Sequence, residues 1–297
     1  MSEAWSAAER ESRVFDEYAA YESLSLETED HRWAFGTGFA DPLAGVDTTV
    51  PHGVDPAALA ATCLGLADDA LIYSHRLQQW VTRAPELEEE TALANIALDL
   101  LGQARMLLTR AGQAAGWFVP TGSGGDGRDE DRLAFFRDER EFRNVRLVER
   151  ADADFAELTT RLLIFSAWRL ALLQALTADK DPVLAAISAK AVKELAYHRE
   201  YAAGWVIRLG DGTDLSHAKT QAALDTVWPL TGELDLSEET DAFLDAVFAR
   251  ACLTRPCSPP LGPVAGKTGR DGTHTEAMGY ILAELQSVAR AHPDATW

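Results

Sequence analysis

Two sets of polar side chains recur at helical spacing within otherwise apolar stretches, and they include side chains that bind metal ions. Each set is spaced at i, i+4 and i+8: Asn95, Asp99 and Gln103 in one stretch, and Lys190, Glu194 and His198 in another. Residues at this spacing lie along one face of a helix. Helical bundles that hold two iron ions use one Glu from each of two helices and a Glu-x-x-His pair from each of the other two. The sequence can be compared with that ligand set.

The first two long helical stretches lack most residues of this ligand set. Residues 59–80 contain no Glu, and their acids are the adjacent Asp68 and Asp69, whose side chains are short for bridging ligands. In the second stretch the best-placed acid is Asp99, and Gly102 stands three residues later, where the pattern requires histidine. Glycine has no side chain that could coordinate a metal.

The other two stretches come closer to the pattern but do not complete it. Glu157 is the only Glu of the third stretch, near its start. In the fourth, Glu194 is followed at i+3 by Tyr197 and only at i+4 by His198. Counted generously, the helices offer four carboxylates and one histidine, where an oxygen-activating site has two histidines. We therefore predict no working metal centre; the alternative is a competent di-iron site using Asp99, Glu157, Glu194 and His198.

Two interpretations of the polar sets remain open. Asn95, Asp99 and Gln103 could form a solvated helix face, or they could be a polar stripe left inside a bundle where metal ligands once stood. Because buried charges must be paired and hydrogen-bonded, the second interpretation predicts a charge network of Asp99, Lys190 and Glu194 in place of the metal.

The elements that would position these residues are four long helices. Apolar residues recur at steps of three and four, or cover most of the helix circumference, over residues 59–80, 87–112, 155–176 and 182–210. Asp181 followed by Pro182 is a typical helix start. Further helices are predicted near 215–233, 237–253 and 273–291, and a short surface helix in the charged stretch FFRDEREFRNVRLVER. The predicted fold is all-α, a ferritin-like four-helix bundle with additional C-terminal helices, in which residues 113–153 include the crossover connection.

Composition excludes several classes of protein. The chain has 27 Lys and Arg against 47 Asp and Glu, a formal net charge of -20, which repels nucleic acid and anionic membrane surfaces. Its three cysteines form no Cys-x-x-Cys pair, and the N-terminus does not have the pattern of a secretory signal. We expect a cytoplasmic protein. Residues 1–55 show no sustained period and are predicted to be an irregular or partner-wrapping N-terminal extension, and residues 56–297 the helical domain.

Three blocks of the sequence carry a family resemblance: NIALDLLGQAR, DPVLAAISAKA and HTEAMGYILAE. Together with the stretches around them, from about residue 57 to 297, they closely resemble the family of C-type subunits of bacterial phenylacetyl-CoA epoxidases, within the ferritin-like superfamily. The resemblance implies a non-catalytic structural subunit of a monooxygenase complex. Its implied partners are the related catalytic A-type subunit, which holds the di-iron centre, and the other members of the complex. The resemblance also implies that this chain contacts phenylacetyl-CoA only as part of the complex.

Other candidate residues favour structural roles. His274 and Glu276 lie about 200° apart around a helix axis, so they are predicted to cap or to form an interface instead of sharing an ion. His75, His198 and His217 are interpreted as hydrogen-bonded structural histidines, with no nucleophile motif near them. A stand-alone helical binding protein remains the third hypothesis for the whole chain, beside the competent oxygenase and the structural subunit.

Overall fold

The computed structural model describes residues 43–116, 129–257 and 259–293, and these form helices and short 3-10 turns. Over these ranges there is no β-strand, only an isolated bridge between Val264 and Lys267. The predicted all-α fold is confirmed. The α-helices are α2 Pro56–Gln78, α3 Leu87–Ala115, α4 Asp129–Phe135, α5 Phe155–Leu176, α6 Pro182–Gly210, α7 Asp214–Val227, α8 Glu238–Arg250 and α9 Glu276–Ala291.

The ends of the long helices are set by local capping. The Asp181 side chain accepts a hydrogen bond from the Leu184 backbone N–H at 2.8 Å, and Pro182 is the first helical residue, as predicted. α3 runs beyond the predicted residue 112 and ends where Gly116 adopts a left-handed conformation with φ of 66°. α5 has the predicted bounds.

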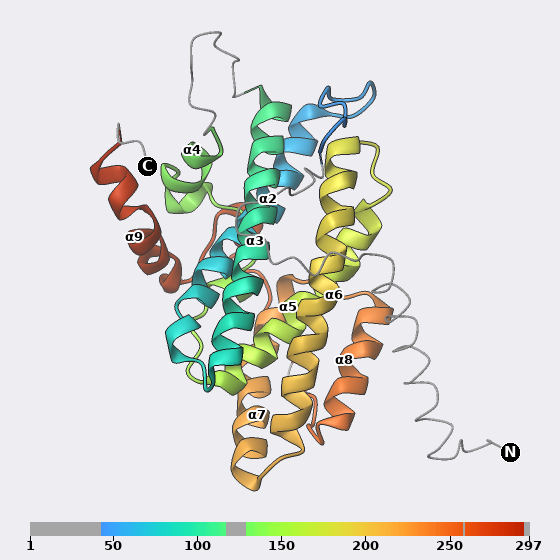
Figure 1. The fold of residues 1–297 in the computed structure, drawn as a ribbon, viewed down its shortest axis with the longest axis vertical. Coiled ribbons are helices and arrows are strands. Elements are labelled where there is room, and N and C mark those ends of the chain that lie inside the picture. The colour runs from blue at the N-terminus through green and yellow to red at the C-terminus, as the bar shows by residue number, and fades with distance from the viewer. Residues whose placement is uncertain (1–42, 117–128, 258, 294–297) are drawn as a thin grey trace, which may run out of the picture. The chain divides into compact units, whose positions relative to one another are not determined.

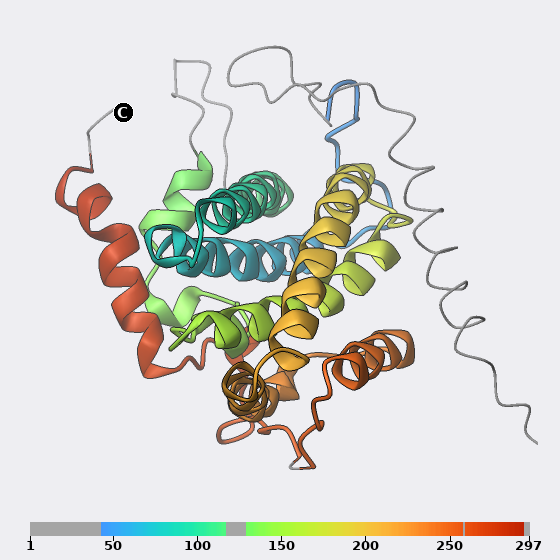
Figure 2. The same cartoon turned by 60° about the horizontal axis from the view of Figure 1, so that its bottom comes forward.

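The four long helices form two adjacent pairs, α2 with α3 and α5 with α6, and α3 packs on α6 between the pairs (Figure 1). α7 and α8 pack against α5 and α6. α9 contacts α4 and α2 on the other side of the bundle, as Figure 2 shows in the turned view. The short connections within each pair make the paired helices antiparallel.

α5 lies in the core of the bundle. It is apolar and buried on nearly all of its circumference. Phe165 on this helix packs edge to face against Tyr73 of α2, with ring centroids 4.5 Å apart. Burial of a side chain such as Phe165 contributes about 1.5–3 kcal/mol. A charged side chain on such a helix has no route to solvent and must find its partners inside the protein.

The charged stretch after α4 differs from its prediction as a surface helix. It forms the 3-10 turns Glu139–Glu141 and Arg146–Glu149, and it packs into the protein with Phe142, Val145 and Leu147 fully buried. Two of its charged residues are buried: Arg137 pairs with Asp68 of α2, and Glu149 binds His274 in the segment before α9. The error arose because charge in a sequence does not reveal whether the fold provides a buried partner for it.

Residues 43–55 are irregular but packed. Leu43, Val46, Val50 and Val54 lie against the core, and the Thr48 carbonyl accepts a hydrogen bond from Arg110 at 2.5 Å. Residues 1–42, the larger part of the predicted N-terminal extension, lie outside the described residues, as do residues 117–128 of the predicted crossover. The described residues belong to one compact unit.

One helical stretch, Pro56–Arg83, is long and apolar enough to cross a membrane by length and composition. In the fold, 72% of its most apolar window is buried inside the protein. The stretch packs against α3 and α5, so its apolar composition is that of a core helix.

Candidate functional site

Four of the predicted residues meet where α3 packs on α6. The Asp99 carboxylate lies 3.0 Å from Nε2 of the fully buried His198, while its own side chain is 38% exposed. One helical turn away, Lys190 forms an ion pair with Glu194. The predicted network of Asp99, Lys190 and Glu194 is thus divided between two pairs: Lys190 with Glu194, and Asp99 with His198.

The other predicted ligand positions lie elsewhere. Glu157 is the third residue of α5. Its carboxylate binds the segment before the helix, accepting from the Ala153 N–H at 3.0 Å and pairing with Arg150. Tyr197 is 45% exposed, and nothing lies within 4 Å of a Cβ placed on Gly102. The predicted positions therefore do not converge on one centre.

A different layer of side chains does converge in the bundle, with one polar residue from each long helix: Asp69 of α2, Gln103 of α3, Arg169 of α5 and Glu194 of α6. Arg169 Nε donates to Gln103 Oε1 at 3.2 Å, and Gln103 Nε2 donates to Glu194 Oε2 at 2.9 Å. Arg169 Nη1 lies 3.9 Å from Asp69 Oδ2. We call these four residues the interior layer.

The polar stripe on α3 therefore passes from solvent into the core. Asn95 and Asp99 are partly exposed, whereas Gln103 is fully buried. The stripe is thus partly solvated at Asn95 and Asp99 and buried at Gln103, and its origin as a former metal site stays a prediction.

The interior layer was only partly visible in the sequence. The helical spacing places Gln103 at the end of a polar stripe and marks Asp69 as a doubtful ligand, but Arg169 belongs to neither pattern. The available signal was that an arginine on a helix that is apolar all round must be buried and must therefore be paired.

The Arg169 side chain is fully buried, and burial lowers its pKa to about 10 against the opposing effect of the Asp69 carboxylate. The guanidinium is therefore still protonated at neutral pH. Its Nη1 and Nη2 atoms are buried with no hydrogen-bond partner among the described residues.

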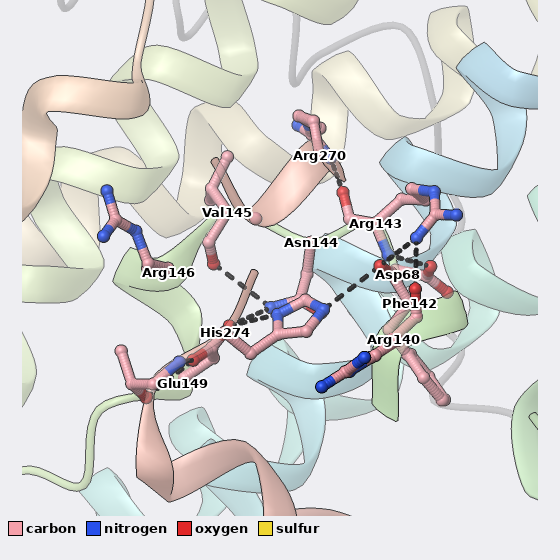
Figure 3. Close-up of polar contacts among 12 residues, drawn as sticks. Asp68, Arg140, Phe142, Arg143, Asn144, Val145, Arg146, Glu149, Arg270 and His274 are labelled. Atoms are coloured by element: carbon pink, nitrogen blue, oxygen red, sulfur yellow. Dashed lines mark hydrogen bonds and ion pairs between the residues drawn. The ribbon is translucent and has the colours of Figure 1, made fainter. Parts of the chain in front are cut away.

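A second buried polar cluster joins the segment after α4 to the start of α9 (Figure 3). His274 is fully buried, with Nδ1 2.7 Å from Glu149 Oε1 and Nε2 3.1 Å from the Phe142 carbonyl oxygen. Both partners are acceptors, so both ring nitrogens must carry hydrogen, which makes this side chain an imidazolium. Burial alone would lower the pKa of His274, but the hydrogen bonds and the charge of Glu149 outweigh it, and the pKa is raised.

Glu149 is the centre of that cluster. Besides His274, its carboxylate accepts from Asn144 Nδ2 at 2.9 Å and from the backbone N–H of Thr275 at 2.7 Å. Thr275 is the residue that precedes α9. His274, predicted to cap or to form an interface, thus pairs with a carboxylate from another segment of this chain, and the cluster holds α9 in place.

The adjacent acids Asp68 and Asp69 on α2 are both fully buried and bind the same surrounding segments. Asp68 pairs with Arg137, at 3.0 Å from its Nη1, while Asp69 pairs with Arg270 at 2.7 Å. Asp69 also accepts from the Val145 N–H at 2.8 Å. Both carboxylates are saturated by protein donors, which accounts for their burial without a metal ion.

The donor set of the interior layer does not fit a metal pair. A guanidinium has donors only and no lone pair to offer, and an amide replaces one of the carboxylates. Over the described ranges, no group of three or more His, Cys, Asp or Glu side chains is arranged to hold a metal ion. What this arrangement can do chemically is hold charge and hydrogen bonds inside the bundle; it supplies no nucleophile or open coordination position.

Comparison with known proteins gives concordant results. The family model described as phenylacetic acid catabolic protein matches residues 46–251 and 235–297. The chain is also similar to the C subunit of the 1,2-phenylacetyl-CoA epoxidase of Escherichia coli (strain K12). The two are 42% identical over 255 residues, which cover 80% of this chain and 99% of that protein.

Proposed function

The chain belongs to the phenylacetic acid catabolic protein family, and from this membership we propose that it is the structural subunit of a multicomponent 1,2-phenylacetyl-CoA epoxidase. The observation that carries the proposal is its 42% identity to the C subunit of such an epoxidase, over 99% of the length of that protein. In this role it pairs with and stabilises the catalytic subunit during aerobic phenylacetate breakdown.

The interior layer supports a non-catalytic role. Arg169 lies between Asp69 and Gln103 in the interior of the bundle, and a guanidinium cannot coordinate a metal. The di-iron centre is accordingly assigned to the partner, the catalytic A-type subunit, and this chain is not an enzyme by itself. A net charge of -20 also disfavours it as a lone receptor for coenzyme A, which is itself anionic, so phenylacetyl-CoA is met through the complex.

The test is co-expression of this chain, carrying an affinity tag, with the catalytic A-type subunit. We expect a stoichiometric complex after purification, with iron in the complex. With O2, the reductase component and its electron donor supplied, epoxidation of phenylacetyl-CoA should require both chains. The tagged chain expressed alone from iron-supplemented medium serves as the control and should be colourless and inactive.

The two other functions predict different results. A competent oxygenase using Asp99, Glu157, Glu194 and His198 would carry about two irons per chain when purified alone, as such sites hold two metal ions. A stand-alone binding protein would form no complex with the catalytic partner. Either result would refute the structural-subunit proposal.

Residues 1–55 and the cellular location belong to the same proposal. We place the protein in the cytoplasm, where the acyl-CoA substrate of the complex is found. The N-terminal extension is proposed to be irregular or to wrap the partner. Its described part, residues 43–55, packs on this chain's own core, so an arm for the partner would have to lie within residues 1–42.

A further inference from the structure

Arg169 is an unusual side chain for its position. It lies on α5, where residues on every side of the helix are buried, and its side chain has no exposed surface. Placing a single positive charge at such a depth is costly unless opposite charge and hydrogen bonds surround it. The structure supplies opposite charge and one hydrogen bond: the Asp69 carboxylate lies 3.9 Å from Nη1, and Gln103 accepts from Nε at 3.2 Å.

The charges around Arg169 alternate across the whole bundle. Asp69 lies between Arg169 and Arg270 on one side, at 3.9 Å and 2.7 Å. On the other side Gln103 connects the guanidinium to Glu194, which pairs with Lys190 at the rim. Each carboxylate of the interior layer therefore already has a protein cation. The charge requirement that a metal pair meets in related bundles is met here by side chains.

We infer that Arg169 is the fixed interior cation of this bundle, taking the electrostatic place of a metal ion and keeping metals out of the interior layer. The inference deepens the proposed function, and its meaning for the complex rests on that function. The residues of this network are Asp69, Gln103, Arg169 and Glu194, one from each long helix. They differ from the network of Asp99, Lys190 and Glu194 predicted from the sequence.

Metal binding by the purified full-length chain tests the inference directly. Equilibrium dialysis against Mn²⁺, an ion that suits carboxylate oxygen ligands, should find no bound metal in the wild type. The double variant Arg169→Glu with Gln103→Glu places a carboxylate from every long helix in the interior layer. We expect it to retain about one Mn²⁺ or more per chain, as carboxylate sites in bundle cores do.

A matched control separates site formation from added charge. Gln174 on α5 and Arg208 on α6 are exposed, and Gln174→Glu with Arg208→Glu changes the net charge by the same amount. This control should bind no Mn²⁺ in dialysis. Stoichiometric metal in the wild type would overturn the inference, and so would a folded double variant that binds no more metal than the control.

A stability series decides the matter if the double variant does not fold. Arg169→Met keeps the length of the side chain but leaves Asp69 and Glu194 without the interior cation. We expect its melting temperature to fall by about 10 °C, whereas Arg169→Lys, which keeps the charge, should lose much less. A Met variant that melts at or above the wild-type temperature would show that no interior cation is needed. None of these measurements depends on complex formation, so failure here is distinguishable from failure of the proposed function.

Discussion

Buried ion pairs link different segments of this chain, over separations of 9 and 71 residues. Arg110 with Asp181 and Arg161 with Asp152 have no exposed side-chain surface on either partner. The attraction within such a pair offsets the cost of removing both charges from water only when the remaining donors and acceptors are also satisfied. Loss of one partner is therefore expected to cost more than the intact pair contributes.

The imidazolium of His274 makes stability depend on pH. Because its folded pKa is raised by Glu149, its contribution is fully present below the unfolded pKa of about 6.5 and is lost as the pH rises through the folded pKa. Glu139 also faces this group and acts in the same direction. In urea unfolding at pH 6, His274→Gln should be less stable than wild type by about 2 kcal/mol.

The comparison across pH supplies the control for this prediction. The difference between wild type and His274→Gln should shrink as the pH is raised toward 9, because the wild-type imidazole loses its proton. A difference that is constant from pH 6 to pH 9 would mean that His274 is neutral in the folded protein, and the hydrogen-bond assignment at Phe142 would then be wrong.

The sequence allowed the deficit of metal ligands to be recognised but not the residues that occupy the interior. Asp99 and Glu157 are acids on long helices, and nothing in their spacing distinguishes them from Asp69, which is the one that reaches the bundle interior. Arg169 could have been placed there from the apolar character of α5 alone. The partners of Arg169 could not be predicted, because contacts between helices depend on the rotation of each helix about its axis.

At the scale of elements, Asp181 has two roles at the start of α6. It caps the helix by accepting from the Leu184 N–H at 2.8 Å, and it pairs with Arg110 of α3, with Nε to Oδ1 at 3.0 Å. Asp181→Ala removes the cap and leaves a buried guanidinium without its carboxylate, so we expect the free energy of unfolding to fall by about 4 kcal/mol. Urea denaturation of the purified chain measures this.

Asp154 offers a matched comparison, since it caps α5 through the Glu157 N–H at 3.1 Å but has a partly exposed side chain. Asp154→Ala should cost only about 1 kcal/mol, the usual value of a cap. If the two alanine variants lose the same stability, the buried pair with Arg110 does not contribute as argued here.

The segment before α2 provides a prediction about the domain boundary. Residues 43–55 place Val46, Val50 and Val54 against the core and give Arg110 the Thr48 carbonyl. A chain that begins at residue 56 should therefore be less stable than one that begins at residue 43, by about 3 kcal/mol from the lost apolar contacts. Thermal and urea unfolding of the two truncated chains measure the difference, and equal stabilities would place the boundary at residue 56.

Helix ends were predictable because capping is local, whereas the segment of 3-10 turns after α4 was not. Asp181 with Pro182 marks a helix start within a few residues of sequence. The turns Glu139–Glu141 and Arg146–Glu149 are instead held by contacts of their segment with α2 and with His274, across 69 and 125 residues of chain. A short segment with few local hydrogen bonds takes its conformation from such contacts. Sequence periodicity does not predict them.

The whole molecule carries 20 more negative than positive charges, and this excess acts against the compact state through self-repulsion. Added salt screens the repulsion, since the Debye length falls from about 30 Å at 0.01 M to about 8 Å at 0.15 M. The fully buried pairs are screened much less. Exposed pairs such as Lys219 with Asp154 are weakened, but each contributes about 0–1 kcal/mol.

We therefore expect the melting temperature of the isolated chain to rise by a few degrees between 0.01 M and 0.15 M NaCl, at about 2–4 °C for each kcal/mol of repulsion removed. Tetramethylammonium chloride at equal ionic strength is the control, because screening does not depend on the identity of the cation, whereas binding of a cation to a site does. A melting temperature that falls with either salt would mean that exposed ion pairs outweigh the net charge. A rise with sodium alone would point to a bound ion instead.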